Sequence, residues 1–166
     1  MEGIAYVDAA TPAREDVFMA SIGQHYPALV RRLTAVVHDP EAALDLAQEA
    51  YLRAYRAWDR FDGTDGRAWL YTIALRLAFN ERRRTLRWRG LLTGRPAPEA
   101  WVAPEDRGLH EALRGLRPEH RAALLLNTVD GYTQAEIAAM LQVQPGTVAS
   151  WVSRAKAHLR EALTDA

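Results

Sequence analysis

The sequence predicts an all-α protein with two small helical domains. Apolar residues recur every three or four positions along most of the chain, and the β-branched alternation typical of strands is absent. Ala, Leu, Arg and Glu, which favour helices, are abundant. A stretch rich in proline and glycine, residues 90–108, interrupts this pattern and predicts a flexible linker. We therefore place one domain at residues 12–89 and the other at residues 109–166.

The first domain is expected to begin with two antiparallel helices. The apolar stripe of the first consists of Phe18, Ile22, Tyr26, Leu29, Leu33 and Val36 or Val37. Pro27 predicts a break or kink within it. The second helix is expected to start after Asp39, a good N-cap, with Pro40 at its first position and Glu41 in the first turn.

The helix that starts at Pro40 has two different faces. The apolar stripe predicted to enter the core is Leu44, Ala47, Tyr51, Ala54, Tyr55 and Trp58. The opposite face carries Asp45, Gln48, Glu49, Leu52 and Arg56. Because that face mixes carboxylates with a bulky apolar residue, it is either a solvated surface or a surface that a partner binds.

A third helix, from about Arg67 to beyond Arg84, follows the short loop FDGTDG. Its expected inward residues are Leu70, Ile73, Ala74, Leu77 and Ala78, and Trp69, Arg76, Asn80 and Arg83 lie on the opposite side. Seven arginines, Arg67, Arg76, Arg82, Arg83, Arg84, Arg87 and Arg89, stand against the single acid Glu81. The net charge of zero therefore hides a basic region, which favours a phosphate backbone as partner. The alternative is an arginine-rich solvated helix end.

The segments DLAQEAYLRAYRAWDRF and RAWLYTIALRLAFNERRR resemble the second conserved region of bacterial sigma factors of the extracytoplasmic-function group. The resemblance implies that the first segment docks on core RNA polymerase through Asp45, Gln48, Glu49, Leu52, Arg53 and Arg56. It also implies that the loop and third helix melt promoter DNA and hold an extruded base. The implied melting residues are Phe61, Asp62, Arg67, Trp69, Arg76, Asn80, Arg83 and Arg84. Cations, aromatic surface and a short loop suit that task.

The second domain contains a predicted helix-turn-helix between Thr133 and Leu163. Thr133 and Glu136 form a capping box, and Pro145 opens the second helix. The inner residues are Ile137, Ala138, Leu141, Val143, Val148, Val152, Ala155 and Leu159, and the candidate DNA-binding residues are Thr133, Thr147, Ser150, Ser153, Arg154 and Lys156. No acid occurs between residues 137 and 160.

Helix-turn-helix units also serve as protein-interaction modules, but the preceding LRGLRPEHRAALLLNTVDGYT resembles the fourth conserved region of the same family. The recognition helix departs from the family pattern at two positions. Ala149 stands where relatives often carry a basic residue, and the next such position is Trp151. Gln142 stands where a turn glycine is common. These departures affect the expected base preference rather than the fold.

Enzymatic chemistry is not expected. The chain has no cysteine, its five histidines are scattered, and no glycine-rich phosphate loop occurs, so we predict no metal, no cofactor and no catalysis. A long apolar stretch and a signal-peptide pattern are both missing, which predicts a cytoplasmic protein without membrane insertion.

These observations predict an alternative sigma factor whose partners are core RNA polymerase, promoter DNA and an anti-sigma factor. Two other functions remain open. An autonomous helix-turn-helix regulator, dimerising on palindromic DNA, would leave the face from Asp45 to Arg56 unexplained. A sigma-like decoy that binds only an anti-sigma protein is disfavoured by the basic surface from Arg76 to Arg89.

Overall fold

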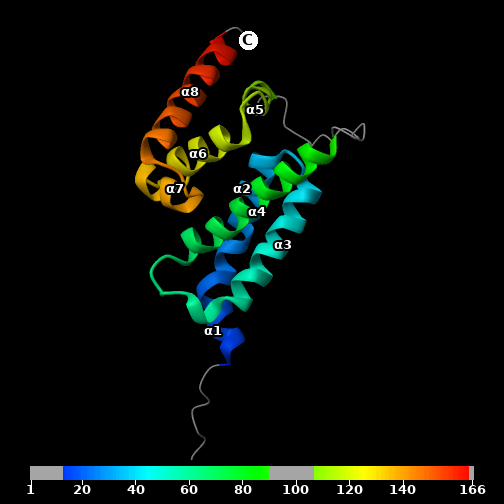
Figure 1. Ribbon diagram of the computed structural model, residues 1–166, viewed down its shortest axis with the longest axis vertical. Coiled ribbons are helices and arrows are strands. Elements are labelled where there is room, and N and C mark those ends of the chain that lie inside the picture. Colours follow the sequence, from blue (N-terminus) through cyan, green and yellow to red (C-terminus); the bar gives the residue numbers. More distant parts are fainter. Residues whose placement is uncertain (1–12, 90–106, 165–166) are drawn as a thin grey trace, which may run out of the picture.

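The computed structural model describes residues 13–89 and 107–164, with side chains described outside 81–89. All regular elements in these ranges are helical, which confirms the predicted all-α fold (Figure 1). The first group is α1 (Arg14–Ile22), η1 (Gly23–His25), α2 (Tyr26–Val37), α3 (Pro40–Arg56), η2 (Trp58–Arg60) and α4 (Gly66–Arg89). The second is α5 (Arg107–Arg114), α6 (Pro118–Thr128), α7 (Gln134–Leu141) and α8 (Pro145–Thr164). The linker prediction and Trp101 lie largely or wholly outside the described residues.

The core of the first group is built on an alanine seam along α3. Ala43, Ala47, Ala50 and Ala54 are each fully buried, and their small side chains let α3 approach α2 and α4. Leu44 was predicted to enter this core, but it is 44% exposed, so that prediction was wrong. The buried stripe is rotated towards the alanines because close helix packing, rather than side-chain hydrophobicity, selects the inward face.

The predicted break in the first helix lies before Pro27 rather than at it. The helix α1 ends at Ile22, the short η1 follows, and α2 begins with Pro27 in its first turn. Proline is tolerated there because an N–H in the first turn has no helical partner. The N-cap predicted for α3 is confirmed, since the Asp39 carboxylate accepts hydrogen bonds from the backbone N–H groups of Glu41 and Ala42 at 3.1 and 3.0 Å.

The helix-turn-helix predicted in the second group is formed by α7 and α8. Its capping box is confirmed: Glu136 N–H donates to the Thr133 hydroxyl at 3.2 Å, and Thr133 N–H donates to the Glu136 carboxylate at 2.7 Å. The predicted core face of α8 is also confirmed, because Val148, Val152 and Ala155 are buried.

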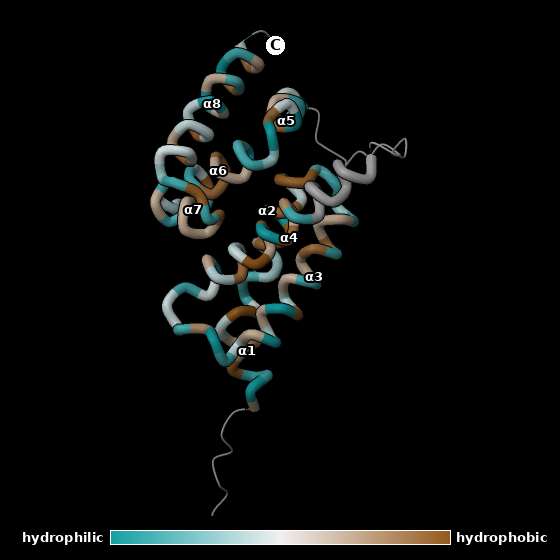
Figure 2. Tube along the Cα trace, viewed as in Figure 1, coloured by the Kyte–Doolittle hydropathy of each residue, from teal (hydrophilic) through white to brown (hydrophobic). Residues whose placement is uncertain are grey.

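The two helical groups touch along α4 and α7 and along α2 and α6 (Figure 1). Apolar residues are distributed over both groups, chiefly where helices face one another (Figure 2). Among the described residues, no helix combines the length and apolar character needed to cross a membrane. The contact between the groups decides which functional surfaces are accessible.

Candidate polymerase and nucleic-acid interfaces

The outward face of α3 is open to solvent. Of the residues predicted to bind polymerase, Asp45, Gln48, Leu52, Arg53 and Arg56 are exposed and Glu49 is half-buried. Glu49 pairs with Arg53 one turn later, at 2.5 Å. Leu52 is 49% exposed, and Leu44 on the same helix is 44% exposed.

An apolar groove of about 510 Å³ adjoins this face. Its walls come from the end of α1, the start of α2 and the middle of α3, and its lining is Met19, Gly23, Tyr26, Pro27, Gln48, Tyr51 and Leu52. Gln48 and Leu52 belong both to the predicted polymerase face and to the groove. The open face of α3 therefore continues into a hollow that can accept an apolar side chain.

The loop between η2 and α4 takes its shape from its own aspartates. Asp62 accepts hydrogen bonds from the backbone N–H and the hydroxyl of Thr64 at 3.0 and 2.7 Å, which lower the pKa of the Asp62 carboxyl. Gly63 occupies the left-handed region with φ +83°, a conformation that favours glycine. Asp65 caps α4 by accepting from Ala68 N–H at 2.9 Å. Hence Asp62 positions the loop, and a direct DNA contact by this carboxylate stays a prediction.

Three aromatic side chains support the loop from beneath. Phe61 stacks on Trp58 with ring centroids 5.1 Å apart, and it also lies 4.9 Å from Trp69. Trp58 and Trp69 are 6.2 Å apart. Because these rings join η2 to the first turn of α4, they connect the two ends of the loop to each other.

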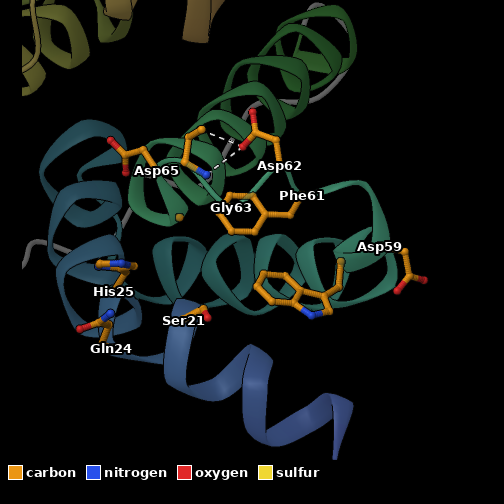
Figure 3. Close-up of a pocket in the computed structure, with 11 residues that line it drawn as sticks. Ser21, Gln24, His25, Asp59, Phe61, Asp62, Gly63 and Asp65 are labelled. Carbon is orange, nitrogen blue, oxygen red and sulfur yellow. Dashed lines mark hydrogen bonds between the residues drawn. The ribbon is translucent and has the colours of Figure 1, made fainter.

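A first cavity of about 660 Å³ lies between this loop and α1 (Figure 3). Its polar lining is dominated by acids and neutral groups: Ser21, Gln24, His25, Asp59, Asp62, Thr64 and Asp65. The pKa of His25 is lowered, first by burial and then by the nearby charge of Arg67. None of its lining residues, within the described part of the chain, is an arginine or a lysine, so the wall itself offers little attraction to a phosphate.

A second cavity of about 440 Å³ lies on the other side of the loop, between the two helical groups. The loop and α4 contribute Asp62, Thr64, Asp65, Ala68, Trp69 and Thr72, and the opposite wall is Tyr132, Glu136, Ala139 and Met140. Both neighbouring arginines of α4 bond to that opposite wall. Arg67 Nε donates to the Tyr132 hydroxyl at 2.8 Å, and Arg76 Nε donates to the Met140 carbonyl at 3.2 Å.

The predicted melting residues thus fall into different settings. Arg67 and Arg76 both bond to the second helical group, and Trp69 lines the cavity between the groups. Asn80 lies further along α4 and is exposed. The side chains of Arg83 and Arg84 lie outside the described residues.

The predicted DNA-binding residues of α8 are accessible. Ser153, Arg154 and Lys156 are exposed, and Thr147 and Ser150 are half-buried. Thr133, at the start of α7, already uses its hydroxyl in the capping box. Trp151 lies against His120, with ring centroids 5.9 Å apart, which gives this tryptophan a packing role.

Sequence reasoning missed a second pair of residues at the contact between the groups. Arg32 of α2 binds the Asp130 carboxylate through two hydrogen bonds, from Nε at 2.7 Å and from a terminal nitrogen at 3.1 Å. Both side chains are nearly buried, with 12% and 9% exposed. An arginine and an aspartate 98 residues apart carry no local signal of their pairing.

Taken together, an exposed basic recognition helix and an aromatic, arginine-bearing helix beside a structured loop define a DNA-binding transcription protein. Comparison with known families agrees. Residues 22–89 match the model of sigma-70 region 2, and residues 106–159 match the model of sigma-70 region 4.

Individual relatives give the same result. The chain is 33% identical to the RNA polymerase sigma factor CarQ of Myxococcus xanthus, covering 94% of this chain and 92% of that protein. It is 32% identical to the extracytoplasmic-function sigma factor SigL of Mycobacterium tuberculosis, covering 98% and 97%. It also resembles the sigma factor RpoE solved with the anti-sigma factor NepR from Bartonella quintana, with a TM-score of 0.80, 26% identity and coverage of 90% and 98%.

The chain therefore belongs to the sigma-70 family, in its extracytoplasmic-function group. It is an alternative sigma factor, which directs RNA polymerase to initiate transcription at promoters.

Proposed function

We propose that the outward face of α3 is the polymerase docking surface, through Asp45, Gln48, Glu49, Leu52, Arg53 and Arg56. The supporting observation is that these side chains are exposed or half-exposed and border an apolar groove. A partner helix could place apolar side chains in the groove while its polar groups meet the charges around it. Such an arrangement, an apolar centre with a polar rim, is common in protein interfaces.

We further propose that promoter melting uses the side of α4 that borders the second cavity. An extruded nucleotide brings a flat base and a phosphate, so its site needs an aromatic surface next to a cation. Both cavities are lined by aromatic and acidic residues, but the second has Trp69 in its wall and both Arg67 and Arg76 beside it, whereas of these two arginines only Arg67 acts on a residue of the first, His25. Phe61 and Asp62 shape the site, and Asn80, Arg83 and Arg84 extend it along α4.

The recognition helix α8 is proposed to read duplex DNA through Thr147, Ser150, Ser153, Arg154 and Lys156, with Thr133 at the start of α7. Ser153, Arg154 and Lys156 point to solvent, as a groove contact requires. In this assignment residues 12–89 bind polymerase and melt the promoter, residues 90–108 connect the domains, and residues 109–166 bind the upstream element. We also propose that the protein acts in the cytoplasm, without catalysis of its own, and is regulated by an anti-sigma factor. The solved complex of RpoE with NepR supports the last point.

The choice between the two cavities is testable with a matched pair of variants. Trp69→Leu removes the aromatic wall of the second cavity, and Gln24→Ala alters only the first. In holoenzyme on a cognate promoter, permanganate footprinting should show reduced melting with Trp69→Leu and parental melting with Gln24→Ala. The reverse pattern would assign the extruded base to the first cavity.

A further inference from the structure

We propose that Met19 is a site of oxidative modification by peroxides, and that its sulfoxide weakens the docking of RNA polymerase. The effect on docking rests on the proposed function of the outward face of α3, because Met19 lines the apolar groove that continues this face. The modification itself rests on the accessibility of the Met19 side chain and on the groups that surround its sulfur.

Met19 is the accessible methionine among the residues that the structure describes. The sequence has three methionines, of which Met1 lies outside the described residues. Met19 is 51% exposed, whereas Met140 is only 6% exposed. The chain has no cysteine, so no thiol of its own competes for an oxidant. Because the oxidant must reach the sulfur, a peroxide should react with Met19 before it reacts with Met140.

The sulfur of Met19 is held at the wall of the groove by Tyr51 of α3. The Tyr51 hydroxyl donates a hydrogen bond to this sulfur at 2.7 Å. Burial, followed by the charges of Glu15 and Tyr26, raises the pKa of Tyr51, so the hydroxyl keeps its proton at neutral pH. Phe18 meets the Tyr51 ring edge-on, with ring centroids 4.9 Å apart. Tyr51 therefore offers a hydrogen-bond donor at a fixed position beside the sulfur.

Gly23 and Tyr51 confine one side of Met19. A Cβ atom added at Gly23 would lie 3.3 Å from the methyl carbon of Met19 and 3.3 Å from the Tyr51 hydroxyl. Carbon atoms pack best at about 3.5 to 4.0 Å, so this side has no room for another atom. An oxygen added to the sulfur must therefore point into the groove or towards solvent.

The reaction transfers one oxygen atom from hydrogen peroxide to the Met19 sulfur. A lone pair of the sulfur attacks one peroxide oxygen, and the S–O bond forms as the O–O bond breaks. The leaving hydroxide takes the proton of the transferred oxygen and departs as water. The sulfur loses two electrons and the peroxide gains them. Methionine sulfoxide reductase reverses this step and restores the thioether.

The sulfoxide makes the groove less suitable for an apolar side chain. A hydrogen bond between two oxygens is about 2.7 Å long, and the Tyr51 hydroxyl already lies 2.7 Å from the sulfur itself. To accept from this hydroxyl, the new oxygen would have to push the sulfur away and displace the groove wall. Without that bond, the oxygen lies in the groove unpartnered, and covering it with a partner is unfavourable. In both arrangements docking is weakened.

The experiment oxidises the full chain alone with hydrogen peroxide, removes the peroxide and then adds untreated core polymerase. Peptide mass spectrometry should show the added oxygen at Met19 well before it appears at Met140. The affinity of the treated chain for core polymerase should fall by about tenfold, as expected when a polar group is covered without a partner. Treatment with methionine sulfoxide reductase should restore the affinity.

Two leucine variants form a matched pair. Met19→Leu should bind core polymerase equally well with and without peroxide treatment, because leucine has no sulfur. Met140→Leu should lose affinity on treatment as the parent does. The comparison is made within each variant, so an effect of the substitution itself on docking cancels. Far-UV circular dichroism should show unchanged helicity after treatment.

Two results overturn the proposal directly: oxidation of Met140 as fast as that of Met19, or an equal loss of affinity in treated Met19→Leu. Gln48→Ala combined with Glu49→Ala, in the untreated chain, tests the docking surface separately. If this variant weakens docking and the sulfoxide at Met19 does not, the effect of oxidation is wrong while the docking surface stands. If neither weakens docking, the outward face of α3 is not the docking surface, and the effect of oxidation on docking is overturned with it.

Discussion

Two faces of the first domain differ in their accessibility. The outward face of α3, with Gln48 and Leu52, is open and continues into an apolar groove. Arg67 and Arg76 of α4, in contrast, bond to the second helical group, Arg67 to the turn before α7 and Arg76 to α7 itself. Both faces are outside the domain's own core. The comparison shows that amphipathicity identifies a functional surface but does not tell whether that surface is accessible.

The largest effect is expected on the open face. Gln48→Ala combined with Glu49→Ala should weaken binding to core polymerase by about 2 kcal/mol or more, the cost that defines hot-spot residues of an interface. Folding stability should fall by only about 0.5 kcal/mol per site, as for most surface substitutions. Quantitative pull-down with core enzyme and thermal denaturation measure the two effects. Glu41→Ala, in the first turn of the same helix, is the control.

The opposite combination would contradict this assignment. Unchanged polymerase binding together with a large loss of stability would mean that the outward face of α3 is a structural surface. The exposed pair between Glu49 and Arg53 is too weak to produce that loss, since helical pairs of this spacing contribute about 0.3 to 0.5 kcal/mol.

A second comparison sets the covered arginines of α4 against Arg154 of α8. Arg154 is exposed, so its contribution to DNA binding needs no opening of the domain contact. A base contact predicts that Arg154→Ala costs about 1 to 3 kcal/mol and relaxes sequence preference at one position. A phosphate contact instead predicts equal weakening for all sequences and a salt slope lower by about 1.

We favour the base contact because Ala149 and Trp151 leave few other side chains to read the groove. Trp151 already packs on His120. Binding of holoenzyme to a cognate upstream element and to single-base variants, at several salt concentrations, separates the two possibilities. If neither affinity nor discrimination changes, α8 is rotated relative to DNA from the orientation we assign.

Within α4, Asn80 differs from Arg67 and Arg76 in its accessibility. It is exposed and lies one helical turn beyond Arg76, on the same side of the helix. Asn80→Ala should reduce open-complex formation by about 1 kcal/mol, the net value of a typical hydrogen bond, while duplex binding stays parental. Permanganate reactivity of melted thymines measures the effect. Equal melting by variant and parent would remove Asn80 from the site.

Local features of this fold could be predicted from the sequence, but contacts between distant segments could not. The N-cap at Asp39 and the capping box at Thr133 follow from residues within three positions of each other. The exposure of Leu44 was missed because periodicity alone did not distinguish an alanine seam from a leucine stripe. The Arg32 and Asp130 pair depends on the packing of one domain on the other.

The same limit applies to the candidate site. The sequence placed Arg76 on the side of α4 that faces away from its core, and it made Arg67 a candidate melting residue. It gave no indication that both would bond to the second domain, because the partner groups are the Tyr132 hydroxyl and the carbonyls of Asp130 and Met140. A backbone carbonyl has no residue-specific signal in a sequence.

The folding stability should also depend on pH through His38. This residue ends α2 and meets His110 of α5, with ring centroids 5.0 Å apart. Burial, followed by the charges of Arg121, His110 and Arg114, lowers the pKa of His38 from 6.5 to about 4. An unfolded chain, where this group titrates normally, therefore binds more protons between these values. Stability should decline as the pH falls from 6.5 towards 4.

The variant His38→Asn tests this effect. Asparagine tolerates the left-handed conformation at this position, φ 55°, but does not titrate. Its melting temperature should change less than that of the parent over the same pH range. The expected effect on stability is confined to acidic conditions, so at neutral pH it is smaller than the effects predicted for the substitutions in α3, α8 and α4. Identical pH profiles for parent and variant would exclude His38 as the titrating group.

The smallest expected effect concerns the turn of the helix-turn-helix. Gln142 has φ 55°, a left-handed conformation that costs a side-chain-bearing residue roughly 1 to 2 kcal/mol relative to glycine. Glycine loses more conformational entropy on folding, about 0.5 to 1 kcal/mol. Gln142→Gly should therefore raise the free energy of unfolding by up to about 1 kcal/mol.

The matched control is Gln134→Gly at the start of α7, where glycine should destabilise the helix by up to about 1 kcal/mol. Chemical denaturation measures both, and stabilisation by both variants, or by neither, would mean that the turn conformation is not what limits stability.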